Sequence, residues 1–124
     1  MSRVETLLSQ MTLTEKIGQL CMLAAGFAVT GPVLARDAEG AVREGRAGSL
    51  LNVYGEEAVR AIQTVALRET RLGIPLLLGF DAVHGHRIVF PVPLAEAAAF
   101  DPMLWQETAR AAALEAAGEG VALT

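Results

Sequence analysis

The pattern of hydrophobic and polar positions first predicts two short helices near the N-terminus. A hydroxyl residue is twice followed three positions later by a glutamate, in the pairs Ser2–Glu5 and Thr12–Glu15. This is the spacing of a capping box, in which the hydroxyl and the carboxylate each bind a backbone N–H that has no partner in the helix. Apolar residues of the second helix recur at helical spacing, so we expect them to face a core as one stripe. They are Leu13, Ile17, Leu20 and Ala24.

From residue 25 the pattern is first irregular and then becomes a succession of strands and helices. Residues 25–36 mix glycine and proline with apolar residues, which predicts an irregular connection, and residues 37–45 can form a short helix. Uninterrupted apolar runs then alternate with helical periodicity, as in a parallel sheet that helices cover on both faces. The predicted elements are, in order, a strand over 48–53, a helix over 56–72, a strand over 74–80, a helix over 102–117 and the start of a strand over 121–124.

Glycine, proline and aspartate mark where these helices begin and end. Gly73 is expected to close the helix over 56–72 in a left-handed conformation, and Pro75 prevents its continuation. Asp101 provides an N-cap for the last helix, and Pro102 suits its first position, where no N–H donor is needed. The order strand–helix–strand–helix–strand predicts parallel strands joined by right-handed crossovers. Both a doubly wound sheet and a (β/α)8 barrel begin in this way.

Composition places the chain among folded proteins and excludes several functional classes. Its 124 residues suit one domain, and 52 % apolar against 19 % charged residues excludes a disordered chain. No apolar run approaches the roughly 20 residues of a membrane helix, and the N-terminal MSRVETLLSQ lacks the apolar core of a secretory signal. The net charge is −4 and the arginines are scattered, so we expect neither a nucleic-acid nor a membrane partner. A cytoplasmic location is favoured, with periplasmic and secreted locations left open.

Candidate chemistry concentrates where the second predicted strand ends, in the segment PLLLGFDAVHGHR of residues 75–87. Asp81 directly follows the apolar run, and ligands collect at the carboxyl ends of parallel strands in both candidate folds. Its carboxylate could cap the turn by accepting hydrogen bonds from backbone N–H groups. Alternatively, its two oxygens could accept charge-assisted hydrogen bonds from the adjacent hydroxyls of a sugar.

The residues that follow Asp81 raise further possibilities. His84 and His86 could join Asp81 as metal ligands, but their spacing matches no metal-site signature, so we favour a role in orienting the loop and expect no metal. Arg87 could hold a carboxylate or cover a Trp or Phe side chain with its planar guanidinium group. Gly85, between the histidines, predicts a positive φ in a tight loop.

Other common functional motifs are absent from the sequence. It contains no glycine-rich phosphate-binding loop and no Gly-x-Ser-x-Gly nucleophile elbow. Cys21 is the only cysteine, so no disulfide can form within the chain. We therefore expect no cofactor and no serine-hydrolase chemistry.

Several segments occur together in an order that is typical of one enzyme family. They are MTLTEKIGQL (11–20), AGSLLN (47–52), RLGIPLLLGFDAVHGH (71–86), FPVPL (90–94), AFD (99–101) and EAAGEG (115–120). In this order they resemble glycoside hydrolase family 3, and the resemblance spans nearly the whole chain. It is closest to the β-glucosidase branch, whose members carry an Asp-x-x-His-Gly turn, here Asp81–Gly85.

The resemblance implies a fold and one binding residue. Residues 1–124 are expected to be an N-terminal fragment of the family's (β/α)8 barrel domain, with about two and a half βα units preceded by helices. Asp81 matches the family carboxylate that binds sugar hydroxyls in the −1 subsite, and His84 and Arg87 are weaker substrate-binding candidates that support the loop. The family's nucleophile, in a Ser-Asp-Trp-like segment, and its acid/base follow later in the family's chain. We therefore expect no catalytic residue in this chain and no activity from it alone.

The expected function is accordingly that of the N-terminal portion of a retaining β-glucosidase-like hydrolase. The complete protein would hydrolyse terminal non-reducing β-D-glucosyl residues of a β-glucoside or oligosaccharide. Two alternatives stay open, a small non-catalytic α/β binding module and a subunit that completes a barrel with another chain. Parallel strands without the rest of a barrel leave an exposed sheet edge, so we expect the isolated chain to self-associate or to need that rest.

Overall fold

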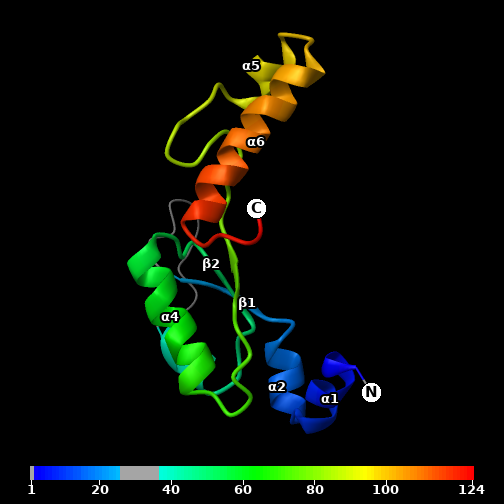
Figure 1. Ribbon diagram of the computed structural model, residues 1–124, viewed down its shortest axis with the longest axis vertical. Helices are drawn as coiled ribbons and strands as arrows, with labels where there is room; N and C mark the ends of the chain where they lie inside the picture. The colour runs from blue at the N-terminus through cyan, green and yellow to red at the C-terminus, as the bar shows by residue number, and fades with distance from the viewer. Residues whose placement is uncertain (1, 26–36) are drawn as a thin grey trace.

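The computed structural model describes residues 2–25 and 37–124, so the irregular connection expected over 25–36 lies almost entirely outside the described residues. Its helices are α1 (Arg3–Gln10), α2 (Leu13–Gly18), α3 (Ala38–Arg43), α4 (Glu56–Arg68), α5 (Pro93–Ala97) and α6 (Pro102–Gly118). Its strands are β1 (Met22–Ala24), β2 (Ser49–Leu51) and β3 (Leu77–Gly79). Figure 1 shows an elongated molecule with α1 and α2 at one end, α5 and the start of α6 at the other, and the strands between them.

The strands form a small parallel sheet in which each strand pairs with the next one along the chain. The order is β1-β2-β3, with Leu50 of β2 aligned between Leu23 of β1 and Leu78 of β3. Beyond β3, the segment predicted as a strand over 121–124 makes one parallel bridge, between Gly79 and Leu123. The chain thus advances across the sheet in a single direction, and the strands at 48–53 and 74–80 are confirmed as shorter elements.

The core lies between the sheet and the helices that follow β1 and β2. Leu50 and Leu78 are fully buried at its centre. The neighbouring helices contribute small and branched side chains, which let them approach the sheet closely. These core residues are Ala41 and Val42 of α3 and Val65 and Ala66 of α4.

Helix termini follow the predicted capping chemistry. In both capping boxes the glutamate accepts from the cap backbone, with distances of 2.6 Å from Ser2 N to Glu5 Oε2 and 2.8 Å from Thr12 N to Glu15 Oε2. Asp101 caps α6 by accepting from the backbone N–H groups of Met103 and Leu104. The helix predicted over 56–72 ends earlier, at Arg68, and a turn continues to Gly73, whose φ is +57° as expected.

The predicted apolar stripe of the second helix is wrong. α2 ends at Gly18, and Ala24 belongs to β1, a strand that the pattern did not predict. Leu20 is 88 % exposed, and Leu13 and Ile17 are exposed as well. The physical reason is that α2 packs through Gly18, where an added Cβ would lie 2.0 Å from the carbonyl oxygen of Gly45, so the apolar side chains point elsewhere.

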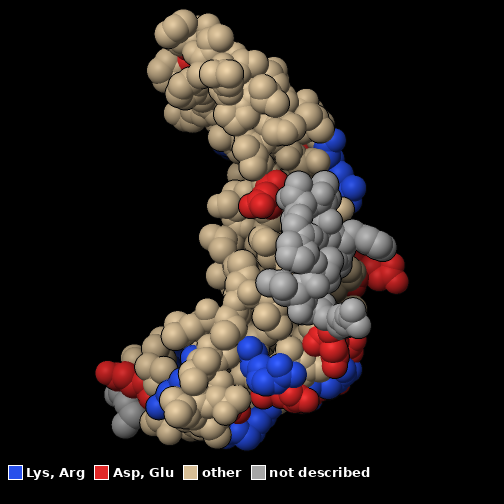
Figure 2. Space-filling model, turned by 180° about the vertical axis from the view of Figure 1, so that it is seen from behind, with Lys and Arg blue, Asp and Glu red and all other residues tan. Residues whose placement is uncertain are grey.

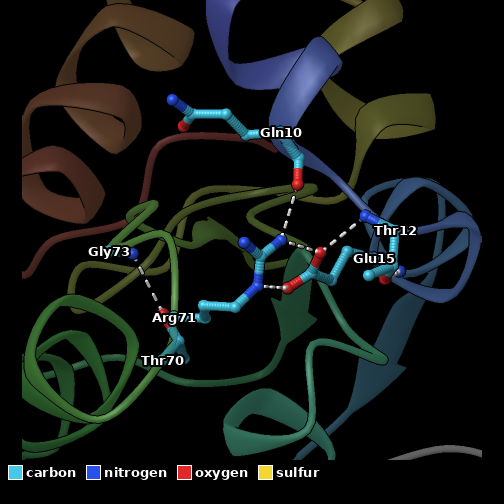
Figure 3. A network of polar contacts seen from close by, with 6 residues as sticks. All are labelled: Gln10, Thr12, Glu15, Thr70, Arg71 and Gly73. Atoms are coloured by element: carbon cyan, nitrogen blue, oxygen red, sulfur yellow. Dashed lines mark hydrogen bonds and ion pairs between the residues drawn. The ribbon is translucent and has the colours of Figure 1, made fainter.

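A network of polar contacts, in which the Arg71 side chain is 53 % exposed and that of Glu15 is 17 % exposed, connects the N-terminal helices to the turn after α4 (Figure 3). The Arg71 guanidinium donates from Nε to Glu15 Oε1 over 3.0 Å and from Nη2 to Glu15 Oε2 over 2.6 Å. The same Nη2 donates to the carbonyl oxygen of Gln10 over 2.7 Å. One arginine therefore links the end of α1 and the start of α2 to the body of the molecule.

Among the described helices, none combines the length and the apolar character that crossing a membrane requires.

Candidate functional site

The candidate site begins at the carboxyl end of β3, where Asp81 leaves the sheet. The backbone on either side of it is held by the adjacent C-terminal segment: Phe80 N donates to Leu123 O over 2.9 Å, and Ala82 N donates to Thr124 Oγ1 over 3.1 Å. Asp81 itself is exposed, and within residues 2–25 and 37–124 its carboxylate takes part in no hydrogen bond or ion pair. The described contacts therefore give no support to a role restricted to capping the turn.

The loop after Asp81 folds back on itself around Gly85. Gly85 has a φ of +118°, which confirms the predicted positive φ, and an added Cβ would lie 2.0 Å from the carbonyl oxygen of Ile88. Isolated bridges pair Gly85 with Val83 and Val89, and Phe90 N donates to His84 O over 2.8 Å. The loop is thus closed by its own backbone, and only glycine fits at its narrowest point.

The structure places the two histidines of this loop in different environments. His84 is exposed and borders a recess of about 130 Å³ between the loop and α6, which Thr108, Ala112 and Thr124 also line. Glu96 of α5 lines the same recess, and its Oε1 is buried without a hydrogen-bond partner in the described structure. His86 is instead buried, with a side chain only 2 % exposed.

His86 lies at the centre of a small aromatic cluster. Its ring meets the rings of Phe80 and Tyr54 edge-on, with centroid distances of 5.0 and 5.5 Å, and Phe80 and Tyr54 are themselves 4.8 Å apart. Edge-to-face geometry of this kind is favourable for aromatic pairs. The cluster joins the loop after β2, the end of β3 and the candidate site loop.

Arg87 is fixed by an acidic residue at the C-terminal end of α6. Its Nε donates to Glu119 Oε1 over 2.6 Å and its Nη2 to Glu119 Oε2 over 2.9 Å, while its Cζ lies 5.5 Å from the centre of the Tyr54 ring. Arg87 therefore holds a carboxylate of the chain, as expected, but the ring that it lies over is Tyr54 and not a Trp or Phe side chain. The hydrogen bonds to Arg87, and secondarily to His86, lower the pKa of Glu119, and the same pairing raises the pKa of Arg87.

Two glutamates of this site were not predicted as site residues. Glu119 binds Arg87 and, through Oε2, lies 3.0 Å from His86 Nε2. Glu115 Oε2 accepts from the backbone N–H groups of Arg87 and Ile88, both over 3.0 Å. Both belong to the segment EAAGEG, which carried part of the family resemblance, but a sequence pattern gives no indication of the loop that these carboxylates meet.

The described residues contain no group of three or more His, Cys, Asp or Glu side chains arranged to hold a metal ion. His86 is turned towards Glu119, whereas His84 is exposed at the recess, so the two rings do not converge with Asp81 on one point.

Comparisons with known proteins agree on one family. The family model for the glycosyl hydrolase family 3 N-terminal domain matches residues 12–124. The chain is 34 % identical over 122 residues to the periplasmic β-glucosidase of Salmonella typhimurium, a match that covers 98 % of this chain and 15 % of that protein.

Solved structures lead to the same family. A mutant β-glucosidase from Listeria innocua in complex with laminaribiose matches with a TM-score of 0.79 and 33 % identity, over 100 % of this chain and 18 % of its own. A β-glucosidase involved in saponin metabolism from intestinal bacteria matches with a TM-score of 0.70 and 32 % identity. This match covers 98 % of the present chain and 15 % of the chain of that β-glucosidase. The chain thus spans less than a fifth of the length of these relatives.

Proposed function

The chain belongs to glycosyl hydrolase family 3, and we propose that it forms the first part of a (β/α)8 barrel in a retaining β-glucosidase, where Asp81 binds hydroxyl groups of the substrate. In this proposal the complete protein hydrolyses terminal β-D-glucosyl residues of a β-glucoside or oligosaccharide. The periplasmic β-glucosidase of Salmonella typhimurium and the laminaribiose complex from Listeria innocua support this substrate class.

The order of the strands supports the barrel. In a doubly wound sheet the strand order reverses, so that a later strand lies on the far side of the first one. Here β1, β2 and β3 are neighbours in chain order, and Leu123 extends the order beyond β3. Continued advance in one direction, with a helix after each strand, is the arrangement that closes into a barrel.

The position of Asp81 carries the proposal for the site. Barrel enzymes place their ligands at the carboxyl ends of the strands, and Asp81 is the second residue after β3. Its exposed carboxylate has no partner among the described residues, whereas Glu119 and Glu115 in the same region are each engaged by the loop. An acceptor held on a fixed backbone with its oxygens unused suits a pair of sugar hydroxyls.

The chemistry of bond cleavage is assigned to other segments. Retaining hydrolysis requires a nucleophile and an acid/base whose carboxyl groups lie about 5 Å apart on either side of the scissile bond. Asp81 can supply one carboxylate at most. We place the nucleophile and the acid/base in parts of the longer relatives that this chain does not match.

His84 and Arg87 differ in what they can contribute. The Arg87 guanidinium is already bound on two sides by Glu119 and covers Tyr54, so we assign it to loop support. His84 is exposed on the same loop and is the candidate for a further contact with substrate.

The test compares Asp81→Asn with an equivalent amide substitution at the opposite end of the sheet. In the complete protein that carries these residues, kcat/KM for 4-nitrophenyl β-D-glucoside is measured for wild type, Asp81→Asn and the control Glu44→Gln. A hydrogen bond to a charged group contributes about 1.5–3 kcal/mol, so Asp81→Asn is expected to lower kcat/KM about 10- to 100-fold. Glu44→Gln, which removes only an exposed pair with Arg46, is expected to leave it unchanged.

Residues 1–124 expressed alone are expected to hydrolyse nothing. Hydrolysis by this shorter polypeptide that disappears in Asp81→Ala would contradict the assignment of both catalytic groups to other segments. An Asp81→Asn variant of the complete protein with undiminished kcat/KM would contradict the binding role of Asp81.

A further inference from the structure

We propose that Glu119 is a positioning residue for Asp81: from the C-terminal end of α6 it holds the loop after β3 through Arg87 and His86, and so fixes the direction of the Asp81 carboxylate. The inference rests on the proposed sugar-binding role of Asp81. It adds a residue that never touches substrate but on which substrate binding depends.

The first part of the argument is that both oxygens of Glu119 are used by the site loop. Oε1 accepts from Arg87 Nε, and Oε2 accepts from Arg87 Nη2 and lies 3.0 Å from His86 Nε2. A two-pronged carboxylate–guanidinium contact fixes orientation as well as distance. The Glu119 side chain is 23 % exposed and that of Arg87 is 60 % exposed, so solvent reaches the contact from the arginine side.

The second part is a short path of packing from Glu119 to Asp81. His86, which Glu119 holds, packs edge-on against Phe80 with a centroid distance of 5.0 Å. Phe80 is the residue immediately before Asp81. Because the His86 ring is buried, a shift of His86 displaces Phe80 or leaves a void beside it.

The third part is that one segment supports both ends of the Asp81 backbone. Glu119 is followed within a few residues by Leu123, whose carbonyl accepts from Phe80 N, and by Thr124, whose hydroxyl accepts from Ala82 N. The end of α6 and the residues after it therefore contact the site at two places. Leu123 and Thr124 bind the backbone beside Asp81, and Glu119 binds the loop that follows it. Glu115, one turn earlier on α6, accepts from the backbone of Arg87 and Ile88 and adds a second anchor.

The decisive experiment is a double-mutant cycle between Glu119→Gln and Asp81→Asn in the complete protein, read out as kcat/KM for 4-nitrophenyl β-D-glucoside. Glutamine keeps the shape of Glu119 but loses its charge and one acceptor. Because a misplacement of about 1 Å can cost up to 100-fold in rate, we expect Glu119→Gln to lower kcat/KM about 10-fold in the wild-type background. In the Asp81→Asn background it should cost less than about 2-fold, since the group that it positions is gone.

The cycle separates positioning from a purely structural role. A general loss of folded protein would reduce activity by the same factor in both backgrounds, and that additive result would overturn the inference. Glu44→Gln removes another glutamate–arginine pair of the chain and is the matched control, expected to have no effect in either background. If Glu119→Gln yields too little folded protein, Arg87→Lys replaces it, because lysine keeps the charge but not the two-pronged contact.

The outcome is distinguishable from a failure of the proposed function. If Asp81→Asn alone leaves kcat/KM unchanged, the sugar-binding role fails and the inference falls with it. If Asp81→Asn lowers kcat/KM and Glu119→Gln is additive with it, the binding role stands and only the positioning role is overturned.

Discussion

At the scale of single residues, Gly85 shows most directly how the site depends on one backbone conformation. Its φ of +118° lies where side chains are strained, and the carbonyl oxygen of Ile88 occupies the space of a Cβ. The sequence predicted a positive φ here because a glycine stood between two histidines in a loop. The close approach of Ile88 could not be predicted, since it depends on how the loop folds back.

Gly85→Ala is expected to destabilise the folded chain. Backbone strain of this kind costs about 1–3 kcal/mol, and the contact with the Ile88 carbonyl adds to it. In the complete protein, thermal unfolding should show a lower Tm for Gly85→Ala. Gly118→Ala is the control, because no atom from elsewhere in the described structure lies within 4 Å of the added Cβ and alanine is favoured in a helix. Equal Tm values for the two variants would contradict the strained loop.

The two histidines illustrate the limit of residue-level prediction. His84 and His86 have nearly the same neighbours in sequence, and either could have been a ligand, a binding group or a support. The fold buries His86 against Phe80 and Tyr54 and leaves His84 exposed. In an extended segment, residues two positions apart face the same side. The different environments of the two rings therefore come from the bend at Gly85, whose φ is +118°, and from the contact of His86 with Glu119.

At the scale of elements, the N-terminal helices are held to the body by a charged contact (Figure 3). Glu15 serves twice: it closes the capping box of α2 and it binds Arg71, which follows α4. The capping box was predicted from sequence because it joins residues three positions apart. The contact with Arg71 spans 56 positions in sequence, and no local pattern indicates it.

The contact between Glu15 and Arg71 predicts that the thermal stability of the folded protein depends on pH. The hydrogen bonds from Arg71, followed by the backbone of Thr12, lower the pKa of Glu15 from 4.5 to about 2. Since the pKa is lower in the folded state, the contact stabilises fully above about pH 4.5 and is lost as the pH falls towards 2. The difference in Tm between wild type and Glu15→Gln should therefore be largest near neutral pH and shrink below pH 4.5.

The matched control is Glu5→Gln, the corresponding position in the capping box of α1. Glutamine can replace glutamate in a capping box, so both variants keep the cap and only Glu15→Gln loses the contact with Arg71. A Tm difference for Glu15→Gln that is independent of pH, or one that Glu5→Gln reproduces, would contradict the proposed role of this ion pair.

At the scale of the whole molecule, apolar surface is unevenly distributed. On the face that Figure 2 shows, few charged side chains are visible at the end of the molecule that Figure 1 assigns to α5 and the start of α6. Large apolar side chains are exposed in this region, with exposures of 82 % for Leu94, 91 % for Phe100 and 62 % for Met103. Large exposed apolar side chains that gather at one end of a molecule mark an interaction site or an association hazard.

We therefore expect residues 1–124, expressed alone, to associate in solution. Light scattering at about 10–100 µM should give a mass above that of the monomer, because exposed apolar surface drives association in this range. Leu94→Gln combined with Phe100→Asn should lower the associated fraction; asparagine tolerates the φ of +51° at Phe100. A monodisperse monomer with a cooperative thermal transition would contradict this expectation.

Local patterns of the sequence determined the capping boxes, the strands at 48–53 and 74–80, the helix after Asp101 and the position of Asp81 at a strand end. Each of these features depends on residues a few positions apart, so their periodicity or hydrogen bonding can be predicted without knowledge of the rest of the fold. The tertiary structure alone decided that Met22–Ala24 is a strand and that Leu13 and Ile17 of α2 are exposed. It also decided that Glu119 contacts Arg87 and His86. These outcomes follow from close packing between distant segments, which no short stretch of sequence encodes on its own.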